Sequence, residues 1–257
     1  MKTKLNNNSI KQYGLIGYPL SHSFSKSYFE DKFEREGIEG VTYSNYETLD
    51  LEDFFENIGK DLDGFNITMP YKQAIIPLLD EISPEAKEIG GVNVVKKIYG
   101  KKIYKGYNTD WIGFKKSLVE NIEDVSNLKA LVLGSGASSQ SIAYTLRELG
   151  IEHKIVSRRK QNHTIIYRDL DKELLETHRL IINTTPMGMG EDIGKYPDIN
   201  TELIDSSHIV YDLIYNPEET TLLRLAKQRG AKIINGRRML ETQAEEAWKI
   251  WTNNTLP

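Results

Sequence analysis

Short apolar runs alternate with amphipathic stretches along most of the chain. Runs at residues 13–17, 41–46 and 64–68 predict strands, and the apolar spacing over 25–36 predicts a helix closed by Gly37. The other elements expected in this part are helices over 51–58, from Pro70 onward and over 110–120, and a strand pair over 92–96 and 102–105.

The pattern changes near residue 128. The nearly pure apolar run 128–133 predicts a strand that is buried on both faces of a parallel sheet. The elements expected after it are strands over 154–157, 180–183, 208–213 and 232–234 and helices over 139–149, 220–229 and 238–251. Strands and helices that alternate with short connections predict a doubly wound parallel sheet.

The length agrees with two lobes, because 257 residues correspond to roughly 1.7 domains at about 150 residues each. We expect an α/β fold with a substrate-binding lobe over 1–106, a Rossmann-type lobe over 107–237 and a cleft between them. The C-terminal helix, 238–257, could pack back on the first lobe.

Composition excludes several classes of protein. The net charge of −4 argues against a nucleic-acid partner, and no apolar run is long enough for a membrane helix. The chain has no cysteine, and its five histidines lack metal-binding spacing, so we expect no metal site. Without an apolar N-terminal segment the chain is predicted to be cytoplasmic.

A glycine turn follows the run 128–133. Its residues are Gly134, Ser135, Gly136, Ala137 and Ser138, and the third position of the G-x-G-x-x-G pattern is a serine. Two glycines let the backbone approach a pyrophosphate, which the start of the next helix would also attract. The alternative is a turn that needs glycine for steric reasons alone.

The end of the next predicted strand indicates which dinucleotide binds. NAD-binding folds usually carry an acidic residue there, whereas this chain has Ser157, Arg158 and Arg159. Two guanidinium groups and a hydroxyl suit a ribose 2′-phosphate, so NADP is favoured over NAD. The alternative is a solvated basic turn.

Four polar clusters lie at element ends in the first lobe: residues 21–23, 66–72, 90–93 and 106–110. Their hydroxyls, amides, lysine and aspartate suit a polyhydroxylated carboxylate. Taken singly they have simpler explanations, since Asp110 would be a good helix N-cap and Lys72 a solvated lysine.

Together these clusters resemble shikimate dehydrogenase, from Gly17 to Gln243. The matching motifs are the Ser-His-Ser turn, NITMPYK, GVN, GYNTD, the glycine turn, NTTPMGM, YDLIY and the Asn-Gly pair at 235–236. The resemblance implies reversible, NADPH-dependent reduction of 3-dehydroshikimate to shikimate in aromatic amino-acid biosynthesis.

The resemblance also implies roles for single residues. Lys72 matches the catalytic lysine and Asp110 its aspartate partner. Leu213 and Gly236 match positions beside the nicotinamide, and the glycine turn matches the pyrophosphate site. The remaining positions that match shikimate contacts are Ser21, Ser23, Thr68, Asn93, Tyr215 and Gln243.

The chain departs from the family pattern at three places. Ser157-Arg158-Arg159 replaces Asn-Arg-Thr, Arg237-Arg238 replaces small residues, and Ser139 replaces the third glycine. The alternatives left open are a quinate/shikimate enzyme using NAD or NADP, a methyltransferase, and a non-catalytic NADPH-binding regulator. The chain could be a monomer or a homodimer.

Overall fold

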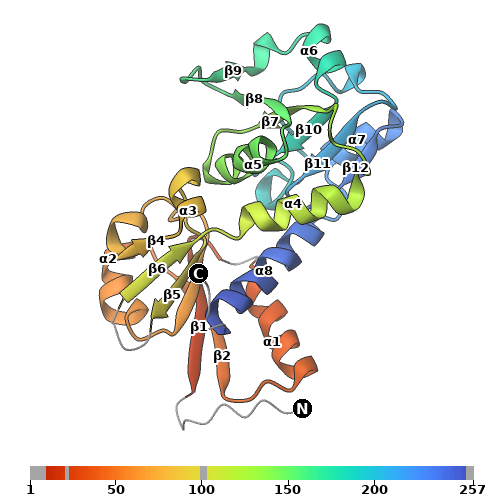
Figure 1. The fold of residues 1–257 in the computed structure, drawn as a ribbon. Helices are drawn as coiled ribbons and strands as arrows, with labels where there is room; N and C mark the ends of the chain where they lie inside the picture. The colour runs from red at the N-terminus through yellow and green to blue at the C-terminus, as the bar shows by residue number, and fades with distance from the viewer. Residues whose placement is uncertain (1–9, 21–22, 99–102, 253–257) are drawn as a thin grey trace. The chain divides into compact units, whose positions relative to one another are not determined.

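The chain divides into two compact units, Met1–Asn108 with Ala247–Pro257 and Thr109–Glu246 (Figure 1). The computed structural model describes residues 10–20, 23–98 and 103–252. Both units are α/β, as the sequence predicts. In these described ranges no helix is long and apolar enough to span a membrane.

The first unit is built on a mixed sheet with strand order β2-β1-β3-β5-β6-β4. Strand β1 is parallel to β2 and β3, whereas β5 is antiparallel to β3 and to β6. Its elements are β1 (Lys11–Gly17), α1 (Ser25–Glu36), β2 (Val41–Glu47), α2 (Leu51–Phe54), β3 (Gly64–Ile67), β4 (Glu81–Ile82), α3 (Pro84–Ile89), β5 (Val94–Ile98) and β6 (Ile103–Tyr107).

Helix α1 confirms the predicted range and its stop signal. It ends before Gly37, which adopts a left-handed conformation with φ 62° and bonds back to the last turn. Phe29 and Phe33, four residues apart, are buried on the face turned to the sheet.

The prediction of a helix that begins at Pro70 is wrong. The backbone instead makes successive turns, in which Tyr71 N–H bonds to Thr68 O and Ile76 N–H to Gln73 O, and it ends in a short 3₁₀ segment, Ile76–Leu78. Pro77 explains the difference, because it has no N–H to continue a helical hydrogen-bond ladder.

The second unit contains an all-parallel sheet with strand order β12-β11-β10-β7-β8-β9. This is the six-stranded order of a dinucleotide-binding fold, with its crossover between β7 and β10. Its elements are α4 (Asp110–Asn121), β7 (Lys129–Leu133), α5 (Ala137–Glu148), β8 (Glu152–Ser157), β9 (Thr164–Ile166), α6 (Lys172–Thr177), β10 (Leu180–Asn183), β11 (Ile209–Asp212), α7 (Thr221–Gln228) and β12 (Lys232–Ile234).

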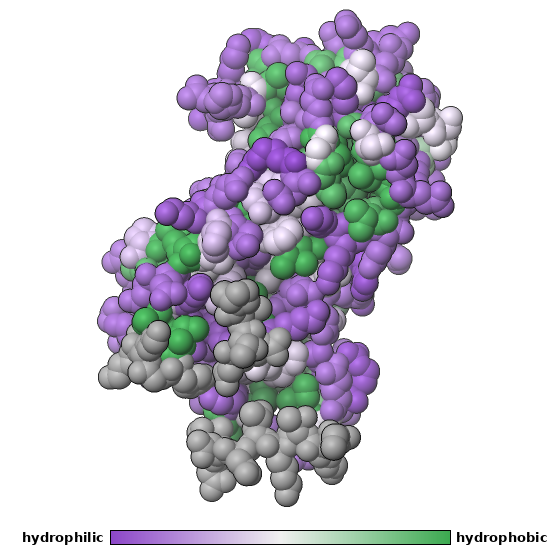
Figure 2. Space-filling view, viewed as in Figure 1, coloured by the Kyte–Doolittle hydropathy of each residue, from purple (hydrophilic) through white to green (hydrophobic). Residues whose placement is uncertain are grey.

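Strand β7 is buried on both faces, as its apolar run predicts. Leu131 and Leu133 pack against one hydrophobic cluster and Ala130 and Val132 against another. All four side chains are fully buried. Figure 2 shows hydrophilic residues over most of the surface in view, with hydrophobic ones in separate patches.

The last helix, α8 (Arg237–Thr252), contributes residues to both units. Within the first unit, Trp251 stacks on Tyr13 with ring centroids 4.7 Å apart, and its indole N–H donates to Val95 O at 3.0 Å. Trp248 lies edge-on to Tyr13 at 5.6 Å. The C-terminal end of α8 is therefore part of the first unit's core.

Candidate active site

The glycine turn connects β7 to α5, where the fold places a dinucleotide pyrophosphate. Gly134 has φ 112°, and a Cβ there would lie 2.6 Å from the Oγ1 atom of Thr184. Only glycine fits this position, because the hydroxyl of Thr184 is itself held by Leu133 O at 2.8 Å.

Gly136 is glycine for a different reason. Its φ of −83° suits any residue, and a Cβ there would have no neighbour within 4 Å. The space beside it is open, at the start of a helix whose first turn carries no acidic residue and whose cap has no side-chain hydrogen bond. These features fit a pyrophosphate, which a Cβ at this position would displace.

Ser139 takes the third fingerprint position without opening the turn. Its side chain is fully buried, and its hydroxyl donates to Gly136 O at 2.6 Å. A serine can therefore replace the third glycine here, because the hydroxyl finds a partner inside the turn.

The three residues predicted to hold the 2′-phosphate lie at the end of β8. Arg158 and Arg159 are exposed, and neither makes an ion pair within the described ranges. Ser157 differs, because its side chain is buried and its hydroxyl donates to Arg159 O and lies 3.1 Å from the hydroxyl of Thr164. Ser157 therefore shapes the loop that presents the two arginines, and its own contact with phosphate stays a prediction.

The described residues of the first unit's polar clusters lie at one edge of its sheet. Strands β1 and β3 are parallel, so the segments that follow Gly17 and Ile67 leave at the same edge, where Tyr18 N–H bonds to Met69 O at 3.1 Å. Strand β5 begins at that edge and β6 ends there, since Asn66 pairs with Val94 and Val94 with Tyr107.

Several candidate residues at this edge are held by the backbone. Thr68 N–H donates to Ile16 O at 2.9 Å, and the carbonyl of Lys72 accepts Val92 N–H at 2.7 Å. The second bond places Lys72 beside the segment that carries Asn93, whose side chain is buried. The sheet therefore brings Thr68, Lys72 and Asn93 together.

The serine pair is described only in part. Ser21 lies outside the described residues. The hydroxyl of Ser23 is buried and has no hydrogen-bond partner in the part of the chain that the structure describes. An unsatisfied buried hydroxyl at this edge fits a substrate group that would complete its hydrogen bonding.

The remaining substrate positions belong to the second unit. Asp110 is the first residue of α4 and is buried, and Thr109 before it lies 3.5 Å from Gln243 Oε1 through its hydroxyl. Asp110 is not the N-cap of α4 that its alternative interpretation predicts. The N-cap is Thr109, one residue earlier, and Asp110 is the first helical residue. Lys72 and Asp110 lie in different units, so their pairing stays a prediction.

Leu213 and Gly236 meet at the end of β11. Gly236 N–H bonds to Ile214 O at 3.0 Å, and a Cβ on Gly236 would lie 1.9 Å from Leu213 O. The two arginines that depart from the family pattern are in ion pairs, Arg237 with Glu241 and Arg238 with Glu120.

A buried network behind these positions was not predicted. Asp212 is fully buried and accepts hydrogen bonds from Asn183 Nδ2 at 3.0 Å, Ile214 N–H at 3.0 Å and the Thr220 hydroxyl at 2.7 Å. Asn183 also donates to Met187 O at 3.3 Å. The network ties the loops after β10 and β11 together and so positions the loop that begins at Leu213. The YDLIY motif marks the position of Asp212 but does not indicate its hydrogen-bond partners.

Asp212 makes the stability of the fold depend on pH. Burial raises the pKa of Asp212 to about 6, although hydrogen bonds from Thr220, Ile214 and Asn183 favour the ionised form. Between an unfolded pKa of about 3.9 and this value, the folded state binds a proton that the unfolded state lacks. The contribution of Asp212 to stability is therefore largest at low pH and is lost as pH rises through 6.

We expect this loss to disappear in Asp212→Asn. Between pH 7 and pH 5, the wild-type free energy of unfolding should rise by about 1 kcal/mol relative to that of the variant. Urea unfolding of both proteins at several pH values measures the difference, and other titrating groups cancel in it. Parallel pH profiles would contradict the raised pKa.

The order of the strands in the second unit and the glycine turn after β7 define a dinucleotide-binding protein of the Rossmann type, which also has another α/β unit. Residues 15–95 match the family model described as the shikimate dehydrogenase substrate binding domain. A shikimate dehydrogenase (NADP(+)) of Caldanaerobacter subterraneus subsp. tengcongensis is 37% identical over 95% of this chain and 92% of its own. The chain belongs to the shikimate dehydrogenase family.

Solved structures agree over nearly the whole length. The crystal structure of shikimate dehydrogenase from Aquifex aeolicus has a TM-score of 0.86 at 35% identity and covers 98% of this chain and 96% of that one. The shikimate 5-dehydrogenase of Thermus thermophilus, in complex with NADP(H) and shikimate, has a TM-score of 0.83 at 31% identity and covers 96% of this chain and 95% of that one.

Proposed function

We propose that the chain catalyses the reversible, NADPH-dependent reduction of 3-dehydroshikimate to shikimate. The observation that carries this function is the identity of 37% over 95% of the chain, which includes both the glycine turn and the polar edge of the first unit. The protein is an NADP-dependent oxidoreductase that acts on a CH–OH group, in the shikimate pathway.

The chemistry requires a hydride donor and a proton source at the substrate oxygen. NADPH supplies the hydride when it is bound. The ammonium of Lys72 donates the proton to the substrate oxygen in reduction, and the amine accepts it in oxidation. Asp110 orients that ammonium through its carboxylate and is itself fixed at the first position of α4.

The other substrate groups hold the ring in place. The hydroxyls of Ser21 and Ser23 bind the carboxylate, and Thr68 and Asn93 bind ring hydroxyls from the same sheet edge. Tyr215 and Gln243 add contacts from the second unit. The unpartnered hydroxyl of Ser23 in the described part of the chain supports this assignment, because a bound oxygen would complete its hydrogen bonding.

The chain's own groups would bind NADP at three places. Backbone N–H groups from Ser135 to Ser138 bind the pyrophosphate, Arg158 and Arg159 bind the 2′-phosphate, and Leu213 with Gly236 lies beside the nicotinamide. A cytoplasmic location and a monomeric or homodimeric state are part of this proposal as predictions from the sequence.

A steady-state assay tests the function directly. Purified protein is given shikimate or quinate with NADP⁺ or NAD⁺, and the nicotinamide absorbance is followed. We expect turnover of shikimate with NADP⁺ to be the fastest of the four combinations. Faster turnover of quinate would favour the quinate/shikimate alternative, and no turnover at all would favour the regulator.

Cofactor choice should depend on the arginines after β8. A charge-assisted contact with the 2′-phosphate contributes about 1.5–3 kcal/mol, so kcat/KM should favour NADP⁺ over NAD⁺ roughly ten- to hundredfold. Arg158→Gln should lower this ratio, whereas Arg168→Gln, an exchange at an exposed arginine elsewhere in the unit, should leave it unchanged. Equal kcat/KM values for the two cofactors in the wild type would contradict the assignment.

A further inference from the structure

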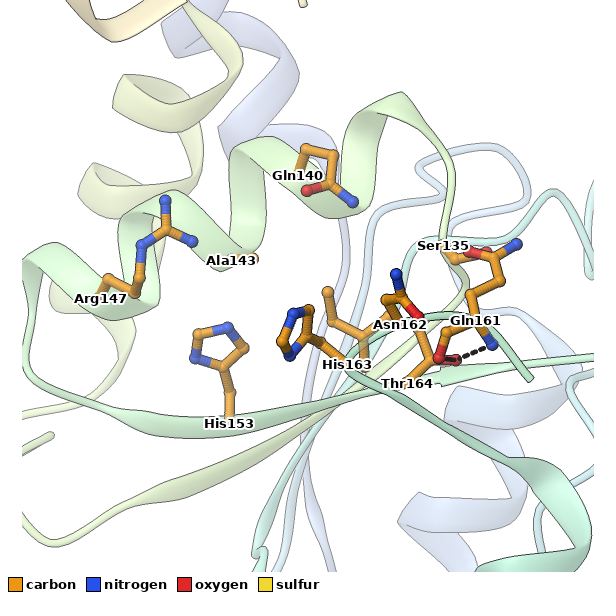
Figure 3. Close-up of a pocket in the computed structure, with 10 residues that line it drawn as sticks. Ser135, Gln140, Ala143, Arg147, His153, Gln161, Asn162, His163 and Thr164 are labelled. Carbon is orange, nitrogen blue, oxygen red and sulfur yellow. Dashed lines mark hydrogen bonds between the residues drawn. The ribbon is translucent and has the colours of Figure 1, made fainter. Parts of the chain in front are cut away.

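A pocket of about 400 Å³ lies in the second unit between α5, β8 and the loop before β9 (Figure 3). Figure 3 shows Arg147, His153 and His163 toward one end of it and Ser135, from the glycine turn, at the other. Pockets that bind small molecules usually have volumes of about 300–1,000 Å³.

The lining of this pocket is suited to an anion. Arg147 brings a permanent positive charge, and His153 and His163 bring two imidazoles. The other polar side chains of the lining are amides and hydroxyls: Ser135, Gln140, Gln161, Asn162 and Thr164. Among the described residues no carboxylate lines the pocket, although the whole chain has more acidic than basic residues.

The imidazole of His153 is held in place at the pocket wall. Its Nδ1 lies 3.3 Å from Ile151 O, and since a carbonyl only accepts, Nδ1 is the donor and Nε2 is left for another partner. Burial and the nearby charge of Arg147 both lower the pKa of His153. The positive charge of Arg147 therefore acts on the imidazole of His153, and a bound anion would compensate this charge.

His163 reaches the pocket from an unusual backbone conformation. Its φ of 64° is the only positive value among the non-glycine residues that the structure describes. The flanking turn is closed by hydrogen bonds from Gln161 N–H to Thr164 Oγ1 at 2.9 Å and from Thr164 N–H to Gln161 O at 3.2 Å. Such a conformation costs about 1–3 kcal/mol, and residues that adopt it are often found at binding sites.

The basic end of the pocket is separate from the glycine turn. Arg147 lies ten residues beyond Ala137, the first residue of α5, which corresponds to about 15 Å along the helix. His153 is the second residue of β8, at its amino end, whereas dinucleotides bind outside the carboxyl ends of such strands.

We propose that Arg147, His153 and His163 form a second anion site, which binds the phosphate group of a small molecule. Arg147 supplies the charge and a guanidinium that matches phosphate oxygens, and the imidazole of His163 can donate a further hydrogen bond. The free Nε2 of neutral His153 accepts from a protonated phosphate oxygen, and it donates to phosphate only when the ring is protonated. Ala143 and Ile155 give the same pocket an apolar wall, against which the carbon part of a phosphate ester would lie.

Calorimetric titration of the NADP⁺-saturated protein tests this site. The probes are inorganic phosphate and ribose 5-phosphate, which separate free phosphate from a phosphate ester by their relative affinities. We expect both to bind while the cofactor is present. Arg147→Gln should weaken both at least about tenfold, because a charged hydrogen bond is lost. Arg224→Gln, at an exposed arginine of α7, should have no effect.

His163→Gly is a second variant that removes the imidazole and also favours the positive φ, so the melting temperature should not fall. It should weaken phosphate binding without changing kcat for shikimate. Three results would overturn the proposal: no binding of either probe at millimolar concentration, unchanged binding by both variants, or binding to the NADP⁺-free protein that is lost when NADP⁺ saturates it.

Discussion

Replacement of Lys72 by alanine is expected to lower kcat by about 10²–10⁴-fold, with a much smaller change in KM for shikimate. The reason is that a proton donor acts mainly in the transition state, where charge develops on the substrate oxygen, and contributes less to ground-state binding. Steady-state kinetics in the direction of shikimate oxidation measures the loss.

Two further variants keep this experiment interpretable. Lys72→Met retains most of the half-buried stem and should lose as much kcat as Lys72→Ala, since the ammonium is what acts. Lys87→Ala, at an exposed lysine of α3, should behave like the wild type. Unchanged kcat in both Lys72 variants, with normal melting curves, would show that the Lys72 ammonium does not transfer the proton.

Replacement of Asp110 should also lower kcat in the same assay. Asp110→Asn keeps the shape of the side chain and removes its charge, so kcat should fall substantially. The double variant should be little worse than the more damaged single one, because groups that act as a unit are strongly non-additive. Additive losses would mean that Lys72 and Asp110 act separately.

The parts of the fold that could be predicted are those whose signal is local. The apolar run 128–133 predicts β7, and the apolar spacing over 25–36 predicts α1. Both predictions need only neighbouring residues, because a buried strand and an amphipathic helix each show their pattern within a short stretch of sequence. Short elements were missed. Helix α6 is six residues long and begins after Asp171, whose carboxylate caps Leu174 N–H at 2.9 Å, but six residues show no periodicity.

The site divides in the same way. Polar motifs such as 66–72 and 134–139 can be recognised from their residue types. Parallel pairing of β1 with β3, and of β7 with β10, explains why the segments that follow these strands leave at the same edge of each sheet. The Asp212 network could not be derived from neighbouring residues. Asn183 is 29 residues from Asp212, and the two meet because β10 and β11 pair in register.

Alanine at the two glycines of the turn after β7 should weaken NADP⁺ binding for two different reasons. Gly136→Ala places a methyl group in the open space beside α5. This methyl group would have no protein neighbour within 4 Å, so the melting temperature should hardly change. Two charged hydrogen bonds to the pyrophosphate would be lost, each contributing about 1.5–3 kcal/mol, so the Kd for NADP⁺ should rise about 10²–10⁴-fold.

Gly134→Ala should damage the fold as well as the site. Its φ of 112° disfavours alanine, and the new Cβ would lie 2.6 Å from the Oγ1 atom of Thr184. We expect a loss of about 1–3 kcal/mol in the free energy of unfolding together with weaker NADP⁺ binding. Gly194→Ala, at an exposed glycine with no neighbour within 4 Å, is the matched control and should change neither quantity.

Calorimetric NADP⁺ titration and thermal melting of these three variants separate the two explanations of the turn. If glycine is there only because the turn is tight, Gly136→Ala should bind NADP⁺ like the wild type, since nothing in the described protein occupies the space beside it. If that space receives the pyrophosphate, Gly136→Ala should melt normally and lose the cofactor. Normal affinity in Gly136→Ala would therefore contradict the cofactor site, whatever the behaviour of Gly134→Ala.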